Sequence, residues 1–158
     1  MIARVDLHPS LLQAAAPARI DDWRVAVHAL VDDVDATHPD ALTLFVDVEP
    51  DGLLLVWLRS GTAVARTPVR DAALRRHLDE YESVCRRLAS LDEDAGGQRL
   101  LALDMAKKLA HDDAARTLRA LCEPVAPDHA TCRRLFTLVF VLRVDTTTFG
   151  LAHRRHRA

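Results

Sequence analysis

Apolar and polar residues alternate with two different periods along the chain, and each period predicts a different kind of element. In residues 18–34 the apolar positions recur every three or four residues, which is typical of an amphipathic helix. Residues 41–70 alternate at every second position, with turns at Pro50-Asp51-Gly52 and Ser60-Gly61. This segment predicts a three-stranded antiparallel meander, and the short alternation in residues 2–7 is compatible with a fourth strand.

After Pro68 the helical period returns and continues almost to the end of the chain. Residues 71–91 place apolar side chains in one helical stripe, and Gly96-Gly97 separates this helix from the next one. Residues 129–144 follow Asp128, which can cap a helix, and their nearly continuous apolar surface predicts a central helix. The β-branched residues in this last segment leave a strand as the alternative.

These patterns together predict an α+β fold. In it, a small antiparallel β-meander of three to four strands packs against four to five helices, the last of which is central. The length of 158 residues suits one domain. We expect residues 1–144 to form this domain and residues 145–158, which have no period and end in a basic stretch, to form a mobile tail.

Composition and charge exclude several classes of partner. Aromatic residues make up only 4% of the chain, so few side chains can stack on bases, and the formal net charge is −2. The longest apolar run, Leu135–Leu142, is far shorter than the roughly 20 residues of a membrane-spanning helix. The three cysteines form no C-x-x-C pair, which indicates free thiols in a reducing compartment. We therefore expect a cytoplasmic protein with no nucleic acid and no membrane as partners.

The segment around His111 combines charged residues with a change of helical phase. Asp104, Lys108 and His111 are spaced i, i+4 and i+7, so a continuous helix places them on one face. The apolar residues before and after His111 follow different stripes, however, which favours a break there. In that interpretation Asp112 or Asp113 caps a second helix.

His111 itself has two interpretations. At a helix C-terminus it is a cation that the helix dipole stabilises. In a cleft it is a general acid or base, oriented by Asp112 or Glu82. A metal site is not predicted, because the histidines are scattered and match no standard ligand spacing. The usual nucleotide, hydrolase and metalloprotease motifs are absent from the sequence, and no cofactor is predicted.

Arg133 and Arg134 lie in the first turns of the last predicted helix, where the helix dipole disfavours cations. They therefore need anionic partners. One interpretation is an ion pair with an acid of a neighbouring helix, such as Asp104 or Glu82. The other is recognition of a carboxylate or phosphate on a ligand, which the guanidinium fork suits.

Three segments of the C-terminal half carry a resemblance to a known family. They are "RRLFTLVFVL" (residues 133–142), "ALDMAKKLAHDDAARTLRAL" (residues 102–121) and the "ES" pair Glu82-Ser83. In order and spacing they resemble a bacterial family of uncharacterised proteins of about this length, and the resemblance extends over roughly residues 42–142. It implies a shared fold, a cytoplasmic location and a shared site, but no particular reaction.

Two hypotheses about function follow, and the sequence does not decide whether the protein is an enzyme. In the first, a cofactor-independent protein binds an anionic small metabolite at the junction of sheet and helices. The ligand-binding cations are then Arg133, Arg134 and Lys108, and the residues available for acid–base chemistry are His111, Glu82, Asp104 and Asp112. In the alternative, the chain is a non-catalytic accessory or interaction module whose apolar helices form a homodimer or dock a protein partner.

Overall fold

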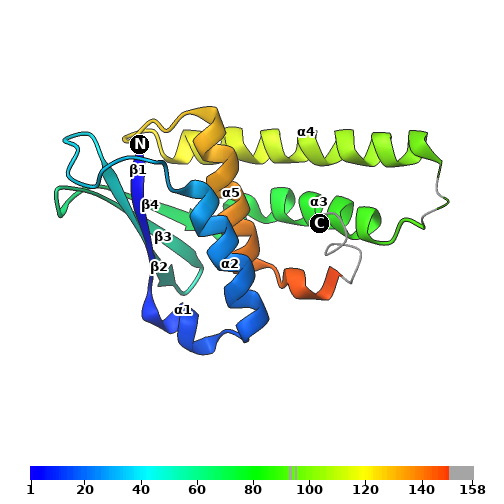
Figure 1. Cartoon of the computed structure of the whole chain (residues 1–158), viewed down its shortest axis with the longest axis horizontal. Helices are drawn as coiled ribbons and strands as arrows, with labels where there is room; N and C mark the ends of the chain where they lie inside the picture. Colours follow the sequence, from blue (N-terminus) through cyan, green and yellow to red (C-terminus); the bar gives the residue numbers. More distant parts are fainter. Residues whose placement is uncertain (93, 95, 150–158) are drawn as a thin grey trace.

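A four-stranded sheet and the helices that cover it share one hydrophobic core. The computed structural model describes residues 1–92, 94 and 96–149. Figure 1 shows α2 and α5 side by side over the sheet, while α3 and α4 extend together away from it. In chain order the elements are β1 (Ile2–Leu7), α1 (Pro9–Ala14), α2 (Pro17–Leu30), β2 (Leu42–Glu49), β3 (Gly52–Arg59), β4 (Thr62–Arg70), α3 (Asp71–Ala89), α4 (Gly97–Leu121), α5 (His129–Arg143) and the 3-10 helix η1 (Thr146–Phe149).

The sheet has the strand order β1-β2-β3-β4, and its last three strands form the predicted antiparallel meander. Glycine is required at the start of β3, because a Cβ on Gly52 would lie 2.2 Å from the carbonyl oxygen of Val69. The prediction of a purely antiparallel sheet is wrong for β1, which pairs in parallel with β2 and sets Val5 beside Leu44. Parallel neighbours need a long crossover connection, and residues 8–41, which contain α1 and α2, supply it.

The last helix, α5, is central, as predicted. Eight of its fifteen residues are buried, and it packs against α2 and α4. Its first turn is capped by the expected residue, since the Asp128 side chain accepts a hydrogen bond from the Thr131 backbone N–H at 2.7 Å. The rings of Phe136 and Phe140 meet the Tyr81 ring edge to face, with centroids 5.4 and 4.7 Å apart, which fixes α5 against α3.

The helix around His111 is continuous, so the predicted break is wrong. α4 keeps one helical phase on the side that packs against the rest of the protein, through Leu103, Ala110, Ala114 and Leu118. The apolar residues that suggested a second phase belong to a separate stripe. These are Leu101, Met105 and Leu109, which are 65%, 53% and 58% exposed. The two sets of apolar residues in the sequence therefore lie on two faces of one continuous helix.

The chain after α5 turns back onto the core within the described residues. Phe149 in η1 is buried, packs against Phe140 and lies beneath the guanidinium of Arg86, 4.6 Å from its ring centroid. The remainder of the predicted basic tail, residues 150–158, lies outside the described residues. None of the helices in the described part is long and apolar enough to cross a membrane.

Candidate functional site

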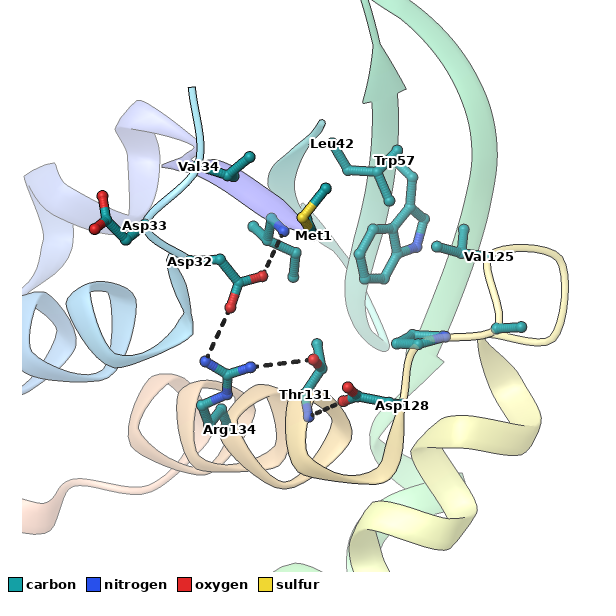
Figure 2. Close-up of a pocket in the computed structure, with 13 residues that line it drawn as sticks. Met1, Asp32, Asp33, Val34, Leu42, Trp57, Val125, Asp128, Thr131 and Arg134 are labelled. Carbon is teal, nitrogen blue, oxygen red and sulfur yellow. Dashed lines mark hydrogen bonds and ion pairs between the residues drawn. The ribbon is translucent and has the colours of Figure 1, made fainter. Parts of the chain in front are cut away.

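A cavity of about 430 Å³ opens where the start of α5 meets the edge of the sheet. Figure 2 shows its two unlike walls. One wall is apolar and comes from the strands and the loop before α5, including Leu42, Trp57 and Val125. The other wall carries the polar groups of α5 and of the segment after α2. The cavity therefore offers an apolar surface opposite a charged one.

Arg134 is the cation of the polar wall. Its Nη1 donates to the carbonyl oxygen of Ala29 at 3.2 Å and to Asp32 Oδ1 at 3.3 Å, and its Nη2 donates to the Thr131 hydroxyl at 3.1 Å. Asp32 also accepts the backbone N–H of Ile2 through Oδ2 at 2.9 Å. The Asp32 carboxylate thus joins the end of α2, the start of β1 and helix α5, and it holds the guanidinium at the edge of the cavity.

Asp128 supplies a second carboxylate to the same wall. The backbone N–H of Thr131, with a smaller contribution from its hydroxyl, lowers the pKa of Asp128, so this group is ionised at neutral pH. Unlike Asp32, it accepts no hydrogen bond from a cationic side chain among the described residues. The polar wall therefore holds one ion pair and two further carboxylates, those of Asp33 and Asp128. Asp128 lies at the positive end of a helix, and the positive charge of the chain's N-terminus also acts on it.

The arginines do form ion pairs, but the predicted partners Asp104 and Glu82 are wrong. Arg133 pairs with Asp112 of α4, and Arg134 pairs with Asp32. Asp104 and Glu82 instead bind cations one turn further along their own helices, which satisfies them locally.

His111 contacts the first turns of α5 rather than either arginine side chain. Its Nε2–H donates to the Arg133 carbonyl oxygen at 2.8 Å, and the Thr137 hydroxyl lies 3.2 Å from the same nitrogen. The ring packs between the rings of Tyr81 and Phe136. Burial lowers the pKa of His111, and the bond to the carbonyl opposes this effect only in part. The imidazole is therefore neutral at pH 7 and joins α4 to α5.

Asp112 forms a small charged cluster next to this contact. It accepts a hydrogen bond from His129 Nε2 at 3.0 Å and pairs with the guanidinium of Arg133. The bond from His129 contributes most to lowering the pKa of Asp112, and Arg133 contributes further. The cluster connects the middle of α4 to the start of α5.

The other predicted site residues lie elsewhere on the helices. Glu82 pairs with Arg86, whose guanidinium also donates to the Thr148 hydroxyl of η1. Lys108 pairs with Asp104 at 2.9 Å on an exposed part of α4. Of the seven candidates, only Arg134 lines the cavity, whereas His111, Asp112 and Arg133 meet at the contact between α4 and α5. The chemistry predicted for one site is thus distributed over four places.

A second cavity, of about 210 Å³, lies among α2, α3, α4, α5 and η1. It is mainly apolar, and its polar lining residues are Asp22, Tyr81, Cys85, Lys107, Thr137 and Thr146. Burial raises the pKa of Tyr81 and of Cys85. Both groups therefore stay protonated at neutral pH, so the Cys85 thiol is a poor nucleophile here.

Two residues of the first cavity were not singled out in the sequence. Asp32 lies in the last turn of the helix predicted over residues 18–34, where the helix dipole disfavours an acid, and this position signals a specific partner. Trp57 is fully buried and donates its indole N–H to the Thr67 hydroxyl, but nothing in a β-strand pattern distinguishes it from an ordinary core residue. No group of three or more His, Cys, Asp or Glu residues with a metal-binding arrangement occurs within the described residues.

Comparison with known proteins places the chain among bacterial relatives. Residues 1–145 match the sequence model of a family described as "Uncharacterised protein family (UPF0262)". A UPF0262 protein of Paracoccus denitrificans is 30% identical over 152 residues, which cover 89% of this chain and 94% of that protein. A second, from Methylobacterium radiotolerans, is 29% identical over 147 residues, covering 89% and 91%. No solved structure matches the chain.

Proposed function

The chain belongs to the uncharacterised protein family UPF0262, and from this premise we propose that it binds a small amino-acid-like metabolite in the cavity at the start of α5. The observation that carries the proposal is the pairing of an apolar wall with Arg134 and Asp128 on the opposite wall. The volume of about 430 Å³ falls in the range of small-molecule sites. The proposed ligand shares one property with the anionic metabolite that the sequence predicts, because it also carries a carboxylate.

Arg134 is the group that receives this carboxylate. Its guanidinium binds Asp32 through one nitrogen at 3.3 Å, which is a longer and weaker arrangement than a two-bond fork. A ligand carboxylate can take the place of Asp32 on the cavity side without moving the arginine far. Asp32 keeps the backbone N–H of Ile2 as a partner after that exchange.

The acids of the polar wall require a positive group on the same ligand. A simple anion would place its charge close to three carboxylates, Asp32, Asp33 and Asp128, which outnumber the two cations of the lining, Arg134 and the N-terminal amine of Met1. An amine that pairs with Asp128 removes this repulsion. A zwitterion with an apolar side chain therefore matches both charged groups and the wall formed by Leu42 and Trp57.

Binding of three matched probes tests the proposal. Leucine, the corresponding acid without its amine and the corresponding amine without its carboxylate are titrated by calorimetry and by thermal denaturation. We expect leucine or another apolar amino acid to bind and both truncated probes to bind at least tenfold more weakly. At ten times its dissociation constant, a ligand stabilises the fold by about 1.4 kcal/mol. If none of the twenty amino acids raises the melting temperature at millimolar concentration, the proposal is wrong.

Two substitutions separate the roles within the cavity. Arg134→Gln should abolish the preference for a carboxylate, whereas Arg133→Gln, the matched change outside the cavity, should leave binding unchanged. Asp128→Asn keeps an acceptor for the helix cap but removes the charge. It should weaken the binding of leucine and spare that of the amine-free acid. Equal binding by the wild type and both cavity variants would contradict the assignment.

Acid–base catalysis by His111 is a separate proposal, because His111 lines neither of the two cavities. Its support is the contact of Nε2 with the hydroxyl of Thr137, which does line the smaller cavity. If a reaction is found, His111→Gln should lower turnover while leaving the binding of leucine intact. Unchanged turnover in this variant would refute the catalytic role.

A further inference from the structure

The first half of α4 carries an apolar stripe on the side that faces away from α3. Leu101, Met105 and Leu109 are spaced four residues apart and are more than half exposed. Together with Leu100, they account for four of the nine large apolar side chains that are exposed among the described residues. Single exposed apolar residues are normal on a protein surface, but a contiguous row on one helix is typical of a contact with another molecule.

The fold itself does not cover this stripe. Figure 1 shows α3 and α4 extending side by side beyond the sheet and the other helices. Leu103 and Ala110 face the body of the protein, so the stripe lies on the opposite side of the same helix. The stripe therefore stays in contact with water in the single chain. Covering it would be favourable, because burying apolar surface stabilises proteins by roughly 25 cal/mol per Å².

We propose that this stripe pairs with the same stripe of a second copy, with the two α4 helices antiparallel and the two-fold axis at Met105. In this arrangement Met105 meets its own counterpart, and Leu101 meets Leu109 of the other copy. The interface is isologous, so each copy contributes the same surface. The proposal is independent of the ligand cavity at α5.

The charges beside the stripe select the antiparallel orientation and the second copy as partner. Asp104 and Lys108 lie on one flank of the stripe, where they form an intrahelical ion pair at 2.9 Å. In an antiparallel pair with a two-fold axis, the same flanks of the two helices face each other. Asp104 precedes the axis by one residue and Lys108 follows it by three. At about 1.5 Å per residue, Asp104 of one copy and Lys108 of the other differ by only about 3 Å along the helix axis.

In this register, Asp104 of each copy therefore lies beside Lys108 of the other copy. Two ion pairs can form across the axis in addition to those within each helix. The opposite flank carries the small side chains of Ala102 and Ala106, which allow the two helices to approach closely. Both flanks are thus compatible with a second α4 in this register.

The size of the contact sets the expected affinity. A helix pair of this length buries less than roughly 1,200 Å² in total, which is the size class of weak or transient complexes. We therefore expect a dimer with a dissociation constant in the micromolar range. Sedimentation velocity over concentrations from micromolar to hundreds of micromolar measures this equilibrium directly. A wild-type protein that stays monomeric over the whole range would overturn the proposal.

Charge reversal tests the register. Asp104→Lys and Lys108→Asp each place like charges across the axis, so each variant alone should dimerise at least tenfold more weakly than the wild type. An equal mixture of the two variants restores opposite charges at both pairs and should form a heterodimer. Asp21→Lys, which breaks a more exposed intrahelical ion pair on α2, is the control and should dimerise normally. A mixture no better than its components would overturn the arrangement.

A cysteine on the proposed axis gives an independent test. Met105→Cys should form an intermolecular disulfide on mild oxidation, because the two positions face each other. The three native cysteines are buried and do not compete. Val64→Cys, at a comparably exposed position on β4, is the control and should remain uncrosslinked. Equal crosslinking of the two variants would refute the assignment of Met105 to the axis.

Discussion

The role of Asp32 can be tested by a single substitution whose energetic cost follows from its contacts. Asp32→Ala removes the partner of Arg134 and also the acceptor of the Ile2 N–H, which is bonded at 2.9 Å. Ile2 is 2% exposed, so its amide loses a partner where water reaches poorly. An unsatisfied buried N–H costs about 1–3 kcal/mol. The ion pair is about one third exposed and adds at most about 1 kcal/mol.

We therefore expect Asp32→Ala to lower the free energy of unfolding by about 2–4 kcal/mol. Urea denaturation followed by circular dichroism measures this value, and an unchanged slope shows that the unfolded state is the same. Asp33→Ala is the matched control, because Asp33 is exposed and should change stability by no more than about 0.5 kcal/mol. Equal stability of the two variants would show that the carboxylate of Asp32 does not hold β1 to α5.

Three further predictions concern the core and its titrating groups. Leu118→Ala should cost about 2–5 kcal/mol in urea denaturation, because removal of this fully buried side chain leaves a cavity in the hydrophobic core. Burial lowers the pKa of His111, so its neutral form stabilises the fold above the unfolded pKa of about 6.5, and this contribution is lost as pH falls through the folded value. His111→Gln should therefore reduce the acid-induced loss of stability between neutral and mildly acidic pH, and an identical pH profile would contradict the burial effect. Burial raises the pKa of Cys122 to about 12 and that of Cys132 to about 11, so a thiol reagent should modify them only after denaturation; rapid labelling of the native protein would be inconsistent with this.

Most of the fold was predictable because local patterns determine it. The period of two in residues 41–70 and the turn at Gly52 correctly indicate the meander, and Asp128 correctly indicates the start of α5. The parallel pairing of β1 was missed, because an alternating strand of six residues carries no signal for its direction. Direction depends on the crossover through α1 and α2, and hence on packing over the whole sheet.

The interpretation of α4 shows how a pattern can be seen correctly and explained wrongly. The two apolar stripes exist, but they are two faces of one helix rather than two helices. Periodicity assumes that apolar residues face the protein's own core. That assumption fails for Leu101, Met105 and Leu109, which are exposed in the single chain.

The sequence by itself determined the α+β class, the meander, the central last helix and the need of Arg133 and Arg134 for anionic partners. These features depend on local periodicity, turn chemistry and the cost of an uncompensated charge, all of which act over a few residues. Only the tertiary structure decided which acids pair with the arginines, where His111 binds and which polar groups share a cavity. Such contacts join residues far apart in the chain, as Asp32 and Arg134 are, and their geometry depends on how whole elements pack together.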